Sequence, residues 1–182
     1  MANDPRDEIV EHLTSLRAFA RSLTRNHAAA DDLVQDTVVK AWSNIDKFQA
    51  GTNMRAWLFT ILRNTFYSSR RKVKREVADV DGAMTAQLSE KPAHDGRLAM
   101  KDFAVAFAEL PDEQREALLL VGASGFSYEE AADMCDCAVG TIKSRVNRAR
   151  KRLTELLELD EDDALELTDA ATVAVISGPA AA

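Results

Sequence analysis

The chain has 182 residues, of which 46% are apolar, and a formal net charge of −7; this length suits one or two small domains with packed cores. No apolar run reaches the ~20 residues of a membrane-spanning helix, and the charged N-terminal segment lacks the pattern of a secretory signal. We therefore expect a cytoplasmic protein that does not enter the membrane.

Helical spacing begins near the N-terminus. Apolar residues recur three and four positions apart at Ile9, Leu13, Leu16, Ala20 and Leu23, which predicts an amphipathic helix. Alternating runs and Asn-Gly turns, the usual signals of strands and hairpins, are almost lacking in the sequence.

A second helix is predicted over residues 31–42. Its first turn would hold Asp31 and Asp32, which suit the positive end of a helix dipole. The expected inner face is Leu33, Val34, Thr37, Val38, Ala41 and Trp42. The outer face, with Gln35 and Asp36, would repel DNA, so it either holds a protein partner or simply serves solubility.

A long helix is predicted from Met54 to Arg75, with Asn53 as its cap. Its apolar arc comprises Met54, Trp57, Leu58, Ile61, Leu62 and Thr65, and its cationic arc comprises Arg63, Tyr67, Arg70 and Lys74, with Arg71 beside it. An aromatic ring among cations can stack on an unpaired base while the charges follow the phosphates. The alternative is a soluble helix end with a half-buried tyrosine.

Helical patterning fades over residues 77–97 and resumes at 98–109 and 111–121. We predict an all-α fold of two small helical domains, residues 1–76 and 98–159, joined by a flexible acidic linker at 77–97. Residues 154–182 carry eight acidic side chains and no basic one. The acidic, alanine-rich tail at 160–182 is expected to be disordered.

The second domain has the pattern of a helix-turn-helix. Ser127 and Glu130 are spaced as a capping box, and Thr141 could cap the final helix. One stripe of that final helix, formed by Ile142, Val146, Ala149 and Leu153, would pack on Ala131, Ala132 and Cys135. Six of the ten residues at 143–152 are basic, which gives the opposite side a strong positive charge.

This basic side suits the major groove of DNA, where the N-terminal residues of a recognition helix reach the bases. We predict that Lys143, Ser144, Asn147 and Arg148 contact bases, and that Thr141, Arg145, Arg150 and Lys151 mainly hold the backbone. A merely solvated basic helix is the alternative.

No enzymatic or metal chemistry is expected. Cys135 and Cys137 are too close in sequence for a useful disulfide, and the three histidines are scattered without zinc-ligand spacing. The sequence also lacks a glycine-rich phosphate loop and a nucleophile–base set. We therefore predict no metal, no cofactor and no catalytic residues.

Four segments together resemble one family. DDLVQDTVVKAW, GTNMRAWLFTILRNTFYSSRRK, LPDEQREALLLVGASGFSYEEAA and CAVGTIKSRVNRARKRL, in this order, are similar to extracytoplasmic-function (ECF) sigma factors of bacterial RNA polymerase. The resemblance covers about residues 9–157 and is closest to the general-stress-response group of alphaproteobacteria.

The resemblance implies a role for each surface. The first domain would bind the polymerase β′ clamp helices and open the −10 promoter element, and the second would read the −35 element and dock on the β flap. A small anti-sigma protein would keep the factor inactive. The free factor would be a monomer. The implied polymerase contacts are Asp31, Asp32, Leu33, Gln35, Asp36 and Lys40. The −10 candidates are Phe48, Asn53, Arg63, Asn64, Tyr67, Arg70, Arg71 and Lys74.

One position departs from the family pattern. The group usually has Cys-Gly-Cys before the recognition turn, whereas this chain has Asp136 between its cysteines. Aspartate tolerates a left-handed backbone less well than glycine but better than most residues, so we expect the turn to survive. Two alternatives to a sigma factor remain at this point: a sigma-like decoy for an anti-sigma protein, and a stand-alone helix-turn-helix regulator. The promoter sequence and the anti-sigma partner cannot be read from the chain.

Overall fold

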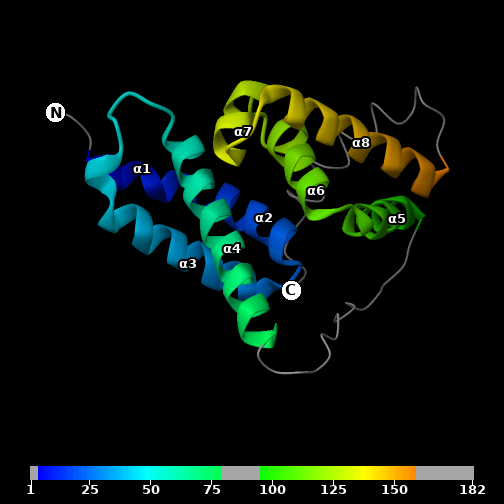
Figure 1. Ribbon diagram of the computed structural model, residues 1–182, viewed down its shortest axis with the longest axis horizontal. Helices are drawn as coiled ribbons and strands as arrows, with labels where there is room; N and C mark the ends of the chain where they lie inside the picture. Colours follow the sequence, from blue (N-terminus) through cyan, green and yellow to red (C-terminus); the bar gives the residue numbers. More distant parts are fainter. Residues whose placement is uncertain (1–3, 79–94, 159–182) are drawn as a thin grey trace.

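The computed structural model describes residues 4–78 and 95–158, and in these ranges every regular element is a helix (Figure 1). This confirms the prediction of an all-α fold with two helical regions. The expected linker at 77–97 lies largely outside the described residues, as does the tail at 160–182; α4 extends to Ala78 and α5 begins at Asp95.

Four α-helices form the first region: α1 (Pro5–Glu11), α2 (Leu13–Thr24), α3 (His27–Ser43) and α4 (Met54–Ala78), with a 3₁₀ turn, η1 (Ile45–Lys47), after α3. The single N-terminal helix that we predicted is divided at His12, which ends α1 and precedes α2. Helices α2, α3 and α4 pack on one another, and fully buried Leu16, Leu58 and Leu62 lie in their shared core.

Helix α3 differs from its prediction in two ways. It begins four residues before Asp31, because the Asn26 side chain accepts a hydrogen bond from the Ala29 amide at 2.9 Å and caps an earlier turn. Asp31 and Asp32 therefore lie beyond the first turn. Trp42, expected in the core, is 53% exposed, because the buried stripe of α3 runs through Leu33, Val34, Thr37 and Ala41 instead.

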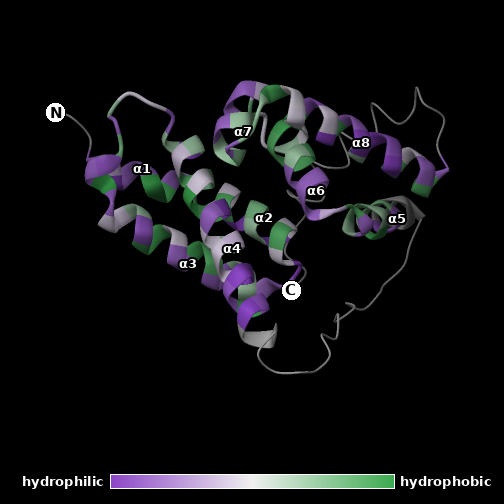
Figure 2. Cartoon of the chain, viewed as in Figure 1, coloured by the Kyte–Doolittle hydropathy of each residue, from purple (hydrophilic) through white to green (hydrophobic). Residues whose placement is uncertain are grey.

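The second region contains α5 (Asp95–Glu109), α6 (Asp112–Leu118), the π-helical turn η2 (Leu119–Ala123), α7 (Tyr128–Cys135) and α8 (Val139–Leu157). Helices α5, α6 and α7 all pack against α8, which shows alternating polar and apolar faces in Figure 2. The helix predicted over 111–121 is shorter than expected, because the chain changes to π-helical bonding at Leu119.

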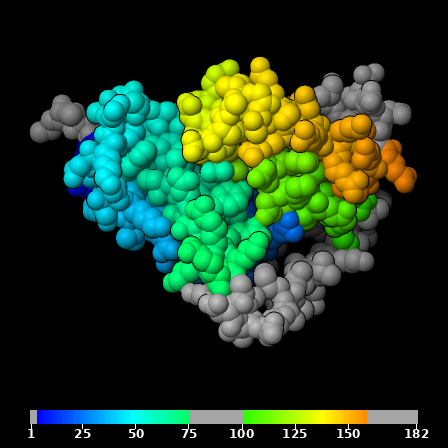
Figure 3. Space-filling model, viewed as in Figure 1, coloured from blue at the N-terminus to red at the C-terminus, as the bar shows by residue number. Residues whose placement is uncertain are grey.

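The two regions are packed against each other. Figure 3 shows α7 and the start of α8 lying directly on α4, and α4 and α7 are in contact. Three rings continue the core across this boundary: Phe19 stacks on Phe59 with centroids 4.8 Å apart, and Phe59 meets the edge of Phe126 at 5.1 Å. Full burial of a phenylalanine contributes about 2 kcal/mol, so Phe126 alone gives this contact a substantial apolar component.

Candidate nucleic-acid interface

The helix-turn-helix of the second region has the expected framework. The Ser127 side chain accepts from the Glu130 amide at 3.0 Å, and Glu130 accepts from the Ser127 amide at 2.9 Å, which confirms the predicted capping box. Asp136 ends α7 with φ 50° and ψ 53°, so the left-handed turn is formed without glycine. The assignment of Thr141 as a cap is wrong: α8 begins at Val139 after Ala138, which places Thr141 inside the first turn.

The apolar stripe of α8 is sealed. Ile142, Val146, Ala149 and Leu153 are all 0% exposed, as predicted from their spacing. This burial fixes the rotation of α8 about its axis. The opposite side is therefore held outward, with Lys143, Asn147, Arg148 and Lys151 exposed.

Several predicted DNA residues of α8 have partners within the protein. Arg145 is only 18% exposed and pairs with Glu113 of α6 at 2.8 Å. The Ser144 hydroxyl, half-buried, donates to the Thr141 carbonyl at 2.9 Å. The Lys143 ammonium lies 5.8 Å from the centre of the Tyr128 ring. Arg150 is half-buried and also interacts within the protein. The outward cations Arg148 and Lys151 are thus more accessible to DNA than Arg145.

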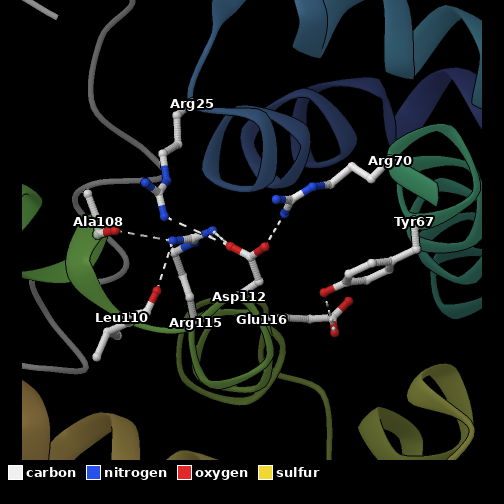
Figure 4. A network of polar contacts seen from close by, with 8 residues as sticks. All are labelled: Arg25, Tyr67, Arg70, Ala108, Leu110, Asp112, Arg115 and Glu116. Atoms are coloured by element: carbon white, nitrogen blue, oxygen red, sulfur yellow. Dashed lines mark hydrogen bonds and ion pairs between the residues drawn. The ribbon is translucent and has the colours of Figure 1, made fainter. Parts of the chain in front are cut away.

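On α4, three members of the predicted cationic arc contact the second region. Arg63 Nε lies 2.8 Å from Oε1 of Glu116, whose side chain is fully buried, and the Tyr67 hydroxyl lies 3.2 Å from Glu116 Oε2. Arg70 pairs with Asp112 at the start of α6 (Figure 4). The basic face of one domain is therefore matched by acids of the other.

Burial changes the ionisation of these groups. Burial disfavours the charged form of Arg63, but the attraction of the Glu116 carboxylate outweighs this effect, so the pKa of the guanidinium is raised. Burial also raises the pKa of the Tyr67 hydroxyl, which therefore keeps its proton and donates to Glu116. For Glu116 itself, burial outweighs the attraction of Arg63 and raises the carboxyl pKa.

Asp112 is held in place by an arginine of its own helix. Arg115, 1% exposed, lies 2.5 Å from Asp112 Oδ1 and donates to the carbonyl oxygens of Leu110 at 3.2 Å and Ala108 at 3.4 Å (Figure 4). Arg25, which directly follows α2, approaches the same carboxylate at 3.9 Å. Burial opposes the charge of Asp112, but the hydrogen bond from Arg70 and the surrounding guanidinium groups lower its pKa.

The other −10 candidates divide into two groups. Phe48 packs on Trp57 with ring centroids 5.3 Å apart, and Asn53 caps α4 through the Ala56 amide at 3.1 Å while donating to Glu130 of α7 at 3.0 Å. The remaining candidates are exposed on α4: Asn64, Arg71 and Lys74. Asn53 is exposed as well, but its side chain is engaged by Glu130, whereas Phe48 is half-buried.

The predicted polymerase face lies on α3. Asp32, Gln35, Asp36 and Lys40 are exposed, with the Lys40 ammonium also donating to the Thr65 hydroxyl at 3.0 Å. Asp31 pairs with Arg17 at 2.8 Å. Leu33 is only 7% exposed and belongs to the core, so its side chain is not presented to a partner.

Sequence reasoning missed the apolar part of this face. Val39 and Trp42 are 64% and 53% exposed, and their spacing from Asp32 and Gln35 places all four on the same side of α3. The guanidinium carbon of Arg6 lies 5.3 Å from the Trp42 ring centre. The exposure of Val39 and Trp42 could have been predicted from the helical phase of Leu33 and Thr37 alone. That prediction requires dropping the assumption that a tryptophan is internal.

The pairing of Asp112 and Glu116 with α4 was also missed, because their partners on that helix lie more than forty positions earlier in the chain. Within the described residues no cluster of histidine, cysteine or acidic groups could hold a metal ion, and no helix is long and apolar enough to cross a bilayer. Cys135 is buried, which raises the pKa of its thiol to about 12 and leaves it protonated.

Known proteins match both regions. The sequence profile of sigma-70 region 2 matches residues 9–76, and that of sigma-70 region 4 matches residues 101–153. The chain is 57% identical to the ECF RNA polymerase sigma factor EcfG of Rhodopseudomonas palustris over 85% of this chain and 86% of that protein. It is 38% identical to the ECF sigma factor SigC of Mycobacterium tuberculosis over 74% of this chain and 72% of that one.

A solved structure gives the same result. The sigma factor RpoE of Bartonella quintana, crystallised with the anti-sigma factor NepR, superposes with a TM-score of 0.76 at 55% identity, covering 85% of this chain and 97% of RpoE.

Proposed function

The chain belongs to the ECF sigma factor family, in the group of EcfG, and from this premise we propose how its surfaces direct core RNA polymerase to promoters under anti-sigma control. We assign core binding and the −10 element to residues 1–76, and the −35 element to residues 98–159. The observation that carries this assignment is that each region holds a long helix with one sealed apolar stripe and one cationic side.

Recognition of the −35 element is assigned to α8. A helix whose rotation is fixed by four fully buried residues can place a constant set of side chains in a major groove. Arg148 offers a bidentate guanidinium for guanine and Asn147 an amide for adenine, while Lys151 suits a phosphate. Arg145, paired with Glu113, contributes by leaving that pair or by orienting α8.

The −10 element is assigned to α4 and the preceding loop. Tyr67 supplies a ring for stacking on an unpaired base, and Arg63, Arg70, Arg71 and Lys74 supply charge along the strand. Asn64 and Phe48 complete the candidate set. Such a surface favours opened DNA over an intact duplex, as promoter melting requires.

Core polymerase is proposed to bind the outer side of α3. Exposed acids beside Val39 and Trp42 form a mixed surface of the kind that protein interfaces use, with an aromatic anchor and a charged rim. This face lies on α3, whereas the side chains assigned to DNA lie on α4, on the loop before it and on α8, so polymerase binding does not use them. The protein itself performs no chemistry in this scheme; it positions and opens DNA for the polymerase.

Anti-sigma control is inferred from relatives whose structures contain such a partner, including RpoE with NepR. We propose a small anti-sigma protein as the partner of this chain and general-stress-response genes as its targets. A decoy or a stand-alone regulator fits less well, because the identity with EcfG spans both regions at 57%.

Transcription in vitro provides the test. Alphaproteobacterial core polymerase with the full chain should initiate from a subset of a randomised promoter library, and the selected sequences should share two elements at fixed spacing. The free protein should bind the same DNA far more weakly, because only the polymerase holds both domains at promoter distance. Equal protection of the promoter by free protein and holoenzyme would contradict the proposal.

A further inference from the structure

Four of the eight −10 candidates are engaged by the second domain. Arg63 and Tyr67 meet Glu116, Arg70 meets Asp112, and Asn53 donates to Glu130. Each partner is a carboxylate. The second domain therefore presents acids to the side chains that are assigned to nucleic acid.

The spacing of these acids suits such a role. Asp112 and Glu116 are four residues apart on α6, so they lie on one side of that helix. Their partners on α4 also share one side: Arg70 follows Tyr67 by three residues and Arg63 by seven. The Glu116 side chain is fully buried, and Asp112 pairs with Arg115 of its own helix as well as with Arg70. Two carboxylates on one side of α6 thus offer negative charge to the cations of α4, as phosphate groups would.

An apolar contact holds the acids in place. Gly125 adopts φ 70°, a backbone conformation that favours glycine, and the next residue, Phe126, is 4% exposed against Phe59 of α4. The Arg55 guanidinium of α4 lies 4.6 Å from the Phe126 ring centre and 5.3 Å from that of Phe59. The domains are thus joined by packing and by charge.

Building on the proposed function, we infer that α6 is an internal substitute for promoter DNA: Asp112 and Glu116 occupy the −10 surface of α4 and keep the free protein from binding single-stranded DNA. Asn64, Arg71 and Lys74 stay exposed and provide a first, weak contact. Full engagement of DNA requires the two domains to separate at the Phe59–Phe126 contact. A sigma factor closed in this way avoids binding DNA without polymerase.

The test compares full-length variants that weaken the contact in different ways. Glu116→Gln and Asp112→Asn each remove one acid, and Phe126→Ala removes apolar packing with no change of charge. Glu109→Gln is the matched control, since it removes one negative charge from an exposed position at the end of α5. Circular dichroism establishes that each variant keeps its helices.

The probe is a fluorescein-labelled, mixed-sequence single-stranded DNA of about twelve nucleotides, within the usual site size of such surfaces. Fluorescence anisotropy gives its affinity, and small-angle X-ray scattering gives the radius of gyration. We expect Glu116→Gln, Asp112→Asn and Phe126→Ala to tighten binding on the order of tenfold, because a larger fraction of molecules is open. They should also increase the radius and steepen the salt dependence, while Glu109→Gln changes none of these.

Two outcomes would overturn the inference: acid variants that bind no better than Glu109→Gln, or domains that separate in Phe126→Ala without tighter DNA binding. Either result leaves the proposed function intact, because transcription by the wild-type holoenzyme is measured separately. Conversely, the chain could fail to support transcription while its variants show the expected anisotropy changes. That result would support the closed state and contradict the assignment as a sigma factor.

Discussion

Arg63 of α4 and Glu116 of α6 form an ion pair across the domain boundary, with Nε and Oε1 2.8 Å apart and the Glu116 side chain fully buried. A buried carboxylate is stable only when its charge is compensated, since desolvation costs several kcal/mol. The pair therefore makes the packing of the two domains depend on a residue that is also a candidate for DNA binding. If Arg63 binds DNA as proposed, contact with DNA and contact between the domains compete for the same guanidinium.

Replacement of Arg63 should reveal this dependence. Arg63→Met leaves Glu116 buried without its counter-ion and should lower the free energy of unfolding by about 3 kcal/mol. In Arg63→Met/Glu116→Gln the loss should be smaller than the sum of the two single changes, with a coupling of about 1–2 kcal/mol. Urea denaturation followed by circular dichroism measures all four proteins; additive losses would show that the two side chains do not interact.

Stability should also respond to pH through Glu116. Burial raises its pKa above the ordinary 4.5, so the folded form holds the proton more tightly than the unfolded chain, although Arg63, Tyr67 and Arg145 oppose this. The unfolded chain therefore gains relative stability as the pH rises above about 4.5, until the carboxyl of the folded form also ionises. Melting temperatures of wild type and Glu116→Gln are measured from pH 4 to pH 8. The wild type should lose stability relative to Glu116→Gln as the pH rises, whereas parallel curves would show that Glu116 does not contribute to the pH dependence.

The sequence predicted each domain better than the relation between them. The stripe of Ile142, Val146, Ala149 and Leu153 follows from helical spacing, and all four are fully buried. The Ser127–Glu130 capping box follows from local rules in the same way. Local periodicity determines which side of a helix is apolar, so these features need no knowledge of distant segments.

The predictions of side-chain exposure were wrong where tertiary contacts determine which residues are covered. Trp42 was assigned to the inner face of its helix, but the phase of α3 turns it outward. Arg63 and Tyr67 were expected to be available to DNA, whereas α6 covers them in this arrangement. Only packing between the domains, which periodicity does not contain, brings Glu116 to α4.

Asp136→Gly should stabilise the second domain. Asp136 has φ 50°, and a left-handed conformation costs an ordinary L-residue about 1–2 kcal/mol, less for aspartate. Glycine removes this cost, so we expect a gain of about 0.5–1 kcal/mol in the free energy of unfolding, measured in urea. A loss of stability would mean that the carboxylate near the start of α8 contributes more than the backbone strain removes.

Trp42→Ala tests the proposed polymerase face. The side chain is 53% exposed, so its removal should change the melting temperature little, whereas an aromatic anchor at an interface contributes about 2 kcal/mol or more to binding. We expect affinity for core polymerase, measured by surface plasmon resonance, to fall at least about tenfold. Val105→Ala, an exposed apolar residue on α5, is the matched control and should bind as wild type does. Equal affinities for the two variants would remove Trp42 from the interface.

Arg148→Ala separates base reading from simple attraction to phosphate. Arg148 is exposed on α8, and a guanidinium bonded to guanine gives about 1–3 kcal/mol of discrimination at one or two −35 positions. Transcription by the variant holoenzyme from single-substitution promoters should therefore lose its preference at those positions and keep it elsewhere. Lys151→Ala, on the same side of α8 and proposed to contact phosphate, should weaken all promoters about equally and reduce the salt dependence. A uniform loss for Arg148→Ala would reassign it to the backbone, and Asn147 would then be the leading base-reading candidate of this helix.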